Sequence, residues 1–190
     1  MSKQIIKPLN VLILGIILSV TAGCGKTEAP TSSSTDQNQS NATGTLFHGE
    51  AMGKQRPGFS MKDMDGKLRN ADEWNGKVLI VNFWATWCPP CRKEIPAFIE
   101  LQDQYGDQGL QFVGIAIDDK DKVQDYIDTM GINYPVLVGE IDAIDLAKRY
   151  GNRFGALPFT AVVDRSGKIV FIQRGEFKHD LMIEKITPLL

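Results

Sequence analysis

Two cysteines lie three residues apart where an apolar run meets a helical pattern, and this junction constrains the fold more than any other feature. The apolar run Val78–Phe83 is interrupted only by Asn82, which is typical of a strand covered on both faces. Over Pro89–Tyr105 the apolar residues recur at close to helical spacing. The segment therefore predicts a buried strand that leads directly into a helix, with Cys88 and Cys91 where the helix begins.

Strand and helix patterns alternate over the rest of residues 46–190, which are numerous enough for one core. A hairpin is expected over Phe59–Leu68 with its turn at Asp65-Gly66, and a second hairpin turns at Arg165–Gly167. The alternation predicts an α/β domain with a parallel or mixed sheet, helices on both faces and a terminal hairpin. The other expected strands are Leu110–Ile117, Tyr134–Val138, Phe159–Asp164 and Lys168–Gln173, and the other expected helices are Lys120–Met130, Ala143–Tyr150 and Phe177–Leu189.

The first 23 residues have the pattern of an export signal. Lys3 and Lys7 are their only charges, and an uncharged stretch with an apolar core at Val11–Val20 follows. This core is shorter than the about 20 apolar residues that a membrane-spanning helix needs. A basic start, a short apolar core and small residues after it predict a secretory signal over residues 1–23.

The residues around Cys24 resemble the lipobox of bacterial lipoproteins. The sequence is Val20-Thr21-Ala22-Gly23-Cys24, with Thr21 where that family most often has Leu. The resemblance implies that Cys24 is lipidated and becomes the mature N-terminus; an ordinary signal peptide and an uncleaved anchor are the alternatives. Residues 24–45 are expected to form a flexible tether, because 13 of residues 25–45 are Ser, Thr, Asn or Gln and cannot bury enough apolar area to order the chain.

The position of the cysteine pair suggests redox chemistry. Unpaired N–H groups at a helix N-terminus carry partial positive charge, so we expect Cys88 to have a lowered pKa and to act as the exposed nucleophile. Pro89 suits the first turn of a helix, and together with Pro90 it stiffens the loop. Cys91, one turn further on, is expected to resolve the mixed disulfide. These steps are those of thiol–disulfide exchange.

The segment Val81-Asn82-Phe83-Trp84-Ala85-Thr86-Trp87-Cys88-Pro89-Pro90-Cys91 resembles the active site of thioredoxin-like proteins. It is most similar to the TlpA/ResA/CcmG branch of exported, membrane-tethered thiol–disulfide oxidoreductases, and the resemblance covers nearly all of residues 57–190. It implies a thioredoxin-like fold with an N-terminal hairpin and a helix–strand insert after Leu110–Ile117. It also implies that Pro158 follows a cis peptide bond and lies against the disulfide, that substrate pairs with the backbone there, next to Leu157, and that Pro96 bends the first helix.

Two polar residues near the motif bear on proton transfer. Many thioredoxins have a buried Asp where this chain has Asn82, and an amide cannot take up the proton of the resolving cysteine. Glu94 matches an acidic residue that the ResA-like branch keeps near its site. Because it lies one helical turn after Cys91, it could tune the thiols or accept a proton. The alternative is a solvated carboxylate on the helix surface.

Four further side chains flank the cysteines. We expect Trp84 and Trp87 to shield the site and to form part of its substrate surface. Arg92 and Lys93 are expected to be solvated charges.

Other chemistries fit the residues less well. A zinc site needs a second pair of ligands, and beyond the motif the chain offers only Cys24, His48 and His179. A cysteine hydrolase needs a paired histidine, and nothing marks His179 as catalytic. Peroxiredoxins place their nucleophile in Thr-x-x-Cys, and Thr86 is not at that distance from either cysteine. A redox-silent binding module is disfavoured, because closing so short a disulfide loop removes little unfolded-state entropy.

The expected function is therefore that of a lipid-anchored, extracytoplasmic thiol–disulfide oxidoreductase. The resemblance implies a reductase of exported proteins, with the CxxCH pairs of apocytochrome c as the best single client. It implies recharging by a membrane thiol-electron donor of the DsbD or CcdA kind, and no metal, nucleotide or flavin. A disulfide oxidase or isomerase is the alternative within the class. Nucleic acid is not an expected partner, because a net charge of −2 provides no basic face.

Overall fold

The computed structural model describes residues 51–190. The expected signal at 1–23, the lipidation site Cys24 and the tether at 24–45 lie outside this range. Within the described part of the chain, none of the helices combines the length and the apolar character needed to cross a membrane.

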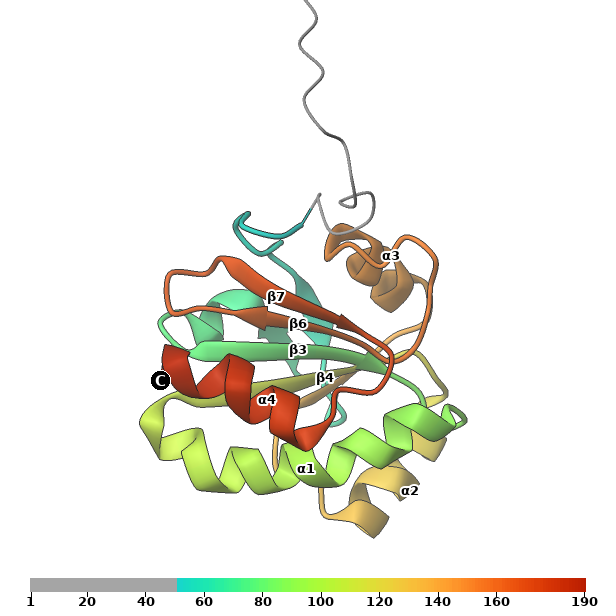
Figure 1. Cartoon of the computed structure of the whole chain (residues 1–190). Helices are drawn as coiled ribbons and strands as arrows, with labels where there is room; N and C mark the ends of the chain where they lie inside the picture. Colours follow the sequence, from blue (N-terminus) through green and yellow to red (C-terminus); the bar gives the residue numbers. More distant parts are fainter. Residues whose placement is uncertain (1–50) are drawn as a thin grey trace, which may run out of the picture. The chain divides into compact units, whose positions relative to one another are not determined.

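A mixed five-stranded sheet forms the centre of the domain, as the sequence predicts (Figure 1). β4 pairs in parallel with β3 and with β5, whereas β6 runs antiparallel to β3 and β7 antiparallel to β6. The order across the sheet is β5-β4-β3-β6-β7. The strands are β3 (Val78–Trp84), β4 (Leu110–Ala116), β5 (Val136–Val138), β6 (Phe159–Val163) and β7 (Ile169–Arg174).

Helices cover both faces of the sheet. Every residue of β3 is buried, and alternate side chains of this strand enter two separate apolar clusters. Ile80 packs in the cluster that receives α1, α2 and α4. Leu79 and Val81 pack in the cluster that receives α3 and the N-terminal hairpin. The helices are α1 (Pro89–Tyr105), α2 (Lys120–Met130), α3 (Ile141–Arg149) and α4 (His179–Ile186).

The N-terminal hairpin consists of β1 (Ser60–Lys62) and β2 (Leu68–Asn70), which pair antiparallel. Gly66 takes a φ of +80° in the connecting turn, a backbone region that glycine enters without a steric penalty. The short helix η1 (Ala71–Trp74) then leads into β3. The expected hairpin and the expected helix–strand insert, which is α2 followed by β5, are both present.

Two helices differ in their bounds from the sequence prediction. The expected helix Phe177–Leu189 is wrong at both ends, because α4 covers His179–Ile186 and the 3-10 turn η3 (Thr187–Leu189) follows. Phe177 lies outside the helix because its side chain is buried and its N–H bonds a carboxylate of α1. Pro188 has no N–H with which to continue an α-helix. α3 begins two residues before the expected Ala143.

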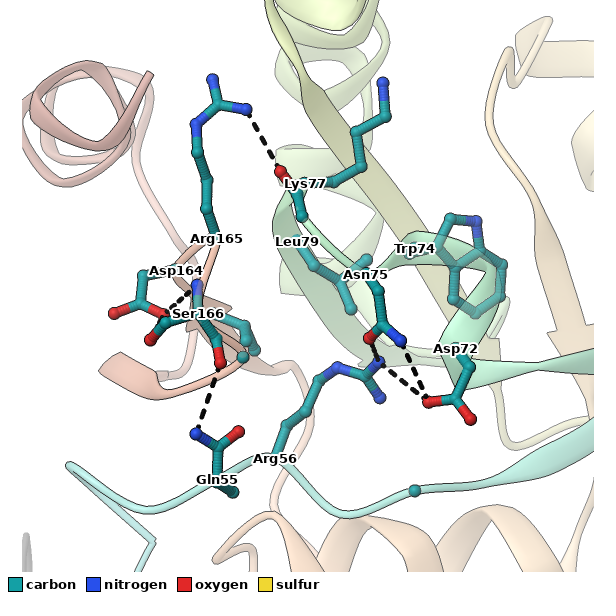
Figure 2. A pocket seen from close by; sticks show the side chains of 14 residues that line it. Gln55, Arg56, Asp72, Trp74, Asn75, Lys77, Leu79, Asp164, Arg165 and Ser166 are labelled. Atoms are coloured by element: carbon teal, nitrogen blue, oxygen red, sulfur yellow. Dashed lines mark hydrogen bonds and ion pairs between the residues drawn. The ribbon is translucent and has the colours of Figure 1, made fainter.

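A hollow of about 400 Å³ lies where β3 begins, and Figure 2 shows the side chains that line it. The other end of β3 leads to the cysteines. Two arginines that line it bond protein groups. Arg56 donates from Nη2 to the Ala71 carbonyl at 2.8 Å and to Asn75 Oδ1 at 2.7 Å. Arg165 donates to the carbonyl oxygens of Gly76, Gln108, Leu189 and Leu190 at 2.8–3.3 Å. Both guanidinium groups therefore join chain segments, and none of the expected site residues lines the hollow.

Candidate active site

Cys88 and Cys91 form a disulfide at the start of α1, with their Cα atoms 5.3 Å apart. Cys88 is the N-cap of the helix, and its sulfur accepts a hydrogen bond from the Cys91 N–H at 3.4 Å. The first two helical residues are Pro89 and Pro90, which need no N–H partner at those positions. The strand, loop and helix thus place the pair as the sequence predicts.

The expectation of an exposed Cys88 is corrected by the structure. Cys88 is 4% exposed and Cys91 is fully buried, so Cys88 is the more accessible of two covered sulfurs. The physical reason is that the disulfide joins Cys88 to a buried partner, and both cysteines pack in the apolar cluster beneath α1.

The two tryptophans occupy different environments. Trp84 ends β3 and is buried, with its ring 5.4 Å from that of Tyr126 on α2. Trp87 lies in the loop just before Cys88 and is 65% exposed. The expectation that Trp84 forms part of the substrate surface is wrong, because its side chain packs in the core cluster that contains both cysteines. Trp87 belongs to the surface around the disulfide. Arg92 and Lys93 are exposed, as expected.

Glu94 is buried rather than solvated, which excludes the surface-carboxylate interpretation. Only 2% of its surface is exposed. Its Oε1 accepts a hydrogen bond from Asn82 Nδ2 at 2.7 Å, and its Oε2 accepts one from the Phe177 N–H at 2.7 Å. Burial raises the pKa of Glu94 to about 8, although these two hydrogen bonds oppose the shift. The carboxyl group therefore titrates close to neutral pH, one helical turn from Cys91.

Asn82 links Glu94 on α1 to Thr160 on the neighbouring strand β6. Its Nδ2 also donates to Thr160 Oγ1 at 2.9 Å, across the β3–β6 pairing. Within residues 51–190, Asn82 Oδ1 and Trp84 Nε1 are the buried side-chain polar atoms that have no hydrogen-bond partner. Both residues lie on the face of β3 covered by α1, because they are two apart along the strand. A small polar environment thus lies behind the cysteine pair.

The loop before β6 brings Leu157 and Pro158 to the end of β3 that carries the cysteines. The Leu157–Pro158 peptide bond is cis, as the resemblance implies. Phe159 pairs with Phe83, so the cis peptide lies beside the point where β3 leaves the sheet. Pro158 is buried, and Leu157 is half-buried against the cluster that contains both cysteines.

One contact near the site was not predicted. Asp118 follows β4 and accepts hydrogen bonds from the Thr86 N–H at 2.9 Å and from Thr86 Oγ1 at 2.5 Å. Burial would raise the pKa of Asp118, but the hydrogen bonds from Thr86 and from the Asp119 N–H hold it below its ordinary value. The carboxylate therefore fastens the loop that leads to Cys88. The sequence feature that could have indicated this contact is an acidic residue directly after the expected strand Leu110–Ile117.

The described side chains provide no metal centre. Across residues 51–190, no three His, Cys, Asp or Glu side chains are grouped so that they could hold a metal ion. The arrangement places a dithiol or disulfide at a helix start, beside a buried carboxyl group with a pKa of about 8.

Known proteins resemble this chain in sequence and in fold. The sequence model of the Redoxin family matches residues 51–188. The thiol-disulfide oxidoreductase ResA of Bacillus thuringiensis (strain Al Hakam) is 32% identical over 143 residues, which cover 72% of this chain and 79% of that protein. ResA of Geobacillus thermodenitrificans (strain NG80-2) is 31% identical over 142 residues, which cover 73% of this chain and 79% of that protein.

Solved structures agree. A thiol:disulfide interchange protein of the thioredoxin family from Chlorobium tepidum TLS has a TM-score of 0.66 at 33% identity, covering 74% of this chain and 98% of that one. A secreted thiol-disulfide isomerase from Corynebacterium glutamicum shares the fold, with a TM-score of 0.68 at 23% identity over 78% of this chain and 94% of that one. The chain belongs to the Redoxin family and is a thiol–disulfide oxidoreductase of the ResA type.

Proposed function

We propose that this protein is a lipid-anchored, extracytoplasmic reductase of disulfides in exported proteins. The observation that carries the proposal is the Cys88–Cys91 pair at the start of α1, with the buried carboxyl group of Glu94 one turn further along. The pair is the redox group, so no added cofactor takes part. CxxCH pairs of apocytochrome c are the proposed client, and a membrane dithiol protein of the DsbD or CcdA kind is the proposed electron donor.

The proposed reaction begins with the reduced pair. The Cys88 thiolate attacks one sulfur of a client disulfide, so that a Cys88–client bond forms and the client bond breaks. The other client sulfur leaves as a thiolate and takes up a proton. Cys91 then loses its proton and attacks the Cys88 sulfur, which releases the second client thiol and closes the Cys88–Cys91 disulfide. The client gains two electrons and two protons, and the donor's dithiol later returns them to the protein.

Glu94 is proposed to take up the proton that Cys91 loses. It lies three residues after Cys91 on the same helix, and both side chains are buried. A carboxyl group with a pKa of about 8 keeps a minor ionised fraction at neutral pH, and this ionised form is the one that can accept the proton. Asn82 and the Phe177 N–H, which bond the carboxyl oxygens, are proposed to position it.

The reduction potential of the purified domain tests the direction of the reaction. A reductase is expected to have a potential near that of thioredoxin, about −270 mV, whereas a strong oxidase lies near −120 mV. Equilibration of the cysteine pair with glutathione buffers of defined ratio, read out by alkylation of the free thiols, gives this value. A potential near −120 mV would support the oxidase alternative and contradict the proposal.

The anchor is tested by replacing its proposed lipidation site. Two acyl chains provide the membrane affinity of a lipoprotein, and a protein without Cys24 cannot carry them. If a general signal peptidase cleaves the signal, Cys24→Ala is therefore expected to move the protein from the membrane fraction to the soluble extracytoplasmic fraction. Mass spectrometry of the unaltered protein should show the added lipid at residue 24. A membrane-bound protein without that lipid would show an uncleaved anchor instead.

A further inference from the structure

A second hollow, of about 320 Å³, is lined by cations. Its lining comes from residues 51–57, from the C-terminal end of α3 with the loop after it, and from the first residue of β7. Among the described residues, no Asp or Glu belongs to this lining. We call it the basic hollow. Its cations are Lys54, Lys148, Arg149 and Arg153, and all four residues are exposed.

Hydrogen bonds fix the segments that form the basic hollow. The Lys54 carbonyl accepts a hydrogen bond from the first N–H of β7 at 2.9 Å. Arg149 donates from Nη2 to the Gly58 carbonyl at 2.6 Å, which joins α3 to the same N-terminal segment. Arg174 donates from Nη2 to the carbonyl of Gly151, a lining residue, at 3.4 Å. Arg174 therefore adds a fifth cation beside the hollow.

The carboxylates near the basic hollow do not cancel its charge. Asp145 bonds Lys148 at 2.9 Å, but both side chains are more than half exposed, and an ion pair this exposed is weak. Asp142 and Asp145 line a different hollow, toward β1, and Glu50 directly precedes the described residues. An excess of positive charge therefore gathers at this place, in a chain whose net charge is −2.

Two exposed isoleucines extend this surface along α3. Ile141 is 73% exposed and Ile144 is 39% exposed. Ile141, Ile144 and Lys148 follow one another at spacings of three and four residues, so they share one face of the helix. Apolar side chains beside cations on one helix face are typical of surfaces that bind at a membrane interface. We call the two isoleucines and the four lining cations the basic face.

The chain from the proposed lipidation site enters the domain at this face. Ala51 lines the basic hollow, and 26 residues, 25–50, separate it from Cys24. Fully extended, such a segment spans about 90 Å, so an anchor at Cys24 keeps the domain near the membrane without pressing any one face against it. It does raise the effective concentration of the membrane surface, so a weak attraction suffices to orient the domain.

We propose that the basic face docks on the anionic phospholipid headgroups of the membrane that anchors the protein. This inference rests on the proposed membrane anchoring and adds the orientation of the domain. Each Lys or Arg beside an anionic membrane surface strengthens the attraction. Docking through α3 leaves the redox pair uncovered, because α1 and both cysteines lie on the other side of the sheet (Figure 1).

The test measures how fast individual lysines are acetylated in the oxidised full chain, reconstituted into vesicles. The vesicles contain either phosphatidylcholine alone or equal parts of phosphatidylcholine and phosphatidylglycerol, and the reagent is a membrane-impermeant sulfosuccinimidyl acetate, read out by mass spectrometry. Lys54 and Lys148 are expected to react about fivefold more slowly in the anionic vesicles. Lys93 and Lys122, exposed on α1 and α2, should react equally fast in both, and high salt should remove the protection.

Lys148→Glu is expected to raise the acetylation rate of Lys54 in anionic vesicles at least threefold, because the reversed charge repels the headgroups that the whole face binds. Lys122→Glu is the matched control, since it makes the same charge change on α2, on the other side of the sheet. It should leave the rate at Lys54 unchanged. Circular dichroism checks that both variants are folded.

The outcomes separate docking from anchoring. Equal rates at Lys54 in the two kinds of vesicle would overturn the docking inference, while the anchor and the reductase function would stand. Equal protection by soluble glycerol phosphate in neutral vesicles would show a site for small phosphates instead, and protection that grows with protein density would show a second copy of the chain; either result would overturn docking on lipid. If the full chain does not stay in the vesicles, the proposed anchoring fails, and the docking inference fails with it.

Discussion

Reduced protein carrying Cys91→Ser is expected to capture clients as stable mixed disulfides and to lose at least 99% of its turnover. Cys88 still forms the bond with the client, because its place as N-cap of α1 is unchanged. The second attack cannot follow, because a serine hydroxyl is not ionised at neutral pH and does not displace a sulfur. Non-reducing electrophoresis of cells that express the variant should show adducts that disappear on reduction.

The matched control is Cys88→Ser, which removes the sulfur that first bonds the client. It is expected to lose turnover to the same degree but to form few adducts, because Cys91 is fully buried. The reverse pattern, with adducts in Cys88→Ser alone, would exchange the roles of the two cysteines. Absence of adducts in both variants would contradict exchange through this pair.

Oxidised protein is expected to lose stability as the pH rises from about 5 to 8, and Glu94→Gln is expected to remove this loss. The pKa of Glu94 rises from 4.5 in the unfolded chain to about 8 in the folded one. Between these values folding takes up a proton, so the free energy of unfolding falls by about 1.4 kcal/mol per pH unit. The stabilisation is complete below pH 4.5, is lost as the pH rises through about 8, and totals roughly 5 kcal/mol.

Urea unfolding of the oxidised protein at several pH values measures this dependence. The disulfide keeps both cysteines from titrating, and the unaltered protein and Glu94→Gln contain the same histidines. The difference between their curves of unfolding free energy against pH therefore reports Glu94 alone. Glu100→Gln is the matched control, because Glu100 lies on the same helix but is exposed. Parallel curves for the unaltered protein and Glu94→Gln would show that Glu94 titrates at its ordinary pKa.

Glu94 also has a kinetic consequence under the proposed mechanism. If it takes up the proton of Cys91, Glu94→Gln should slow the release of captured client about a hundredfold, in line with the loss of general base catalysis. The rate of mixed-disulfide formation at Cys88 should change little. A variant that instead slowed both steps equally would indicate a structural role for the carboxyl group.

The sequence predicted those elements whose ends are marked by local signals. α1 covers Pro89–Tyr105 and α2 covers Lys120–Met130, as predicted. Two prolines begin α1, and α2 has Asp119 as its N-cap and Gly131, with a φ of +67°, as its C-cap. These signals lie within one helical turn of the helix end, so they can be recognised in the sequence without knowledge of the fold. α4 was misplaced because its start depends on where Phe177 is buried.

The sequence by itself determined the cysteine pair, its place after a buried strand and the fold class, because strand periodicity and the start of a helix are local properties of the chain. Only the tertiary structure decided the environment of the pair. Glu94 shares a helical turn with Cys91, but its burial and raised pKa depend on donors 12 and 83 residues away, Asn82 and Phe177. Pro158 likewise lies beside the end of β3 that leads to the cysteines because β6 pairs with β3. Such contacts arise between segments far apart in the chain, and no local pattern encodes them.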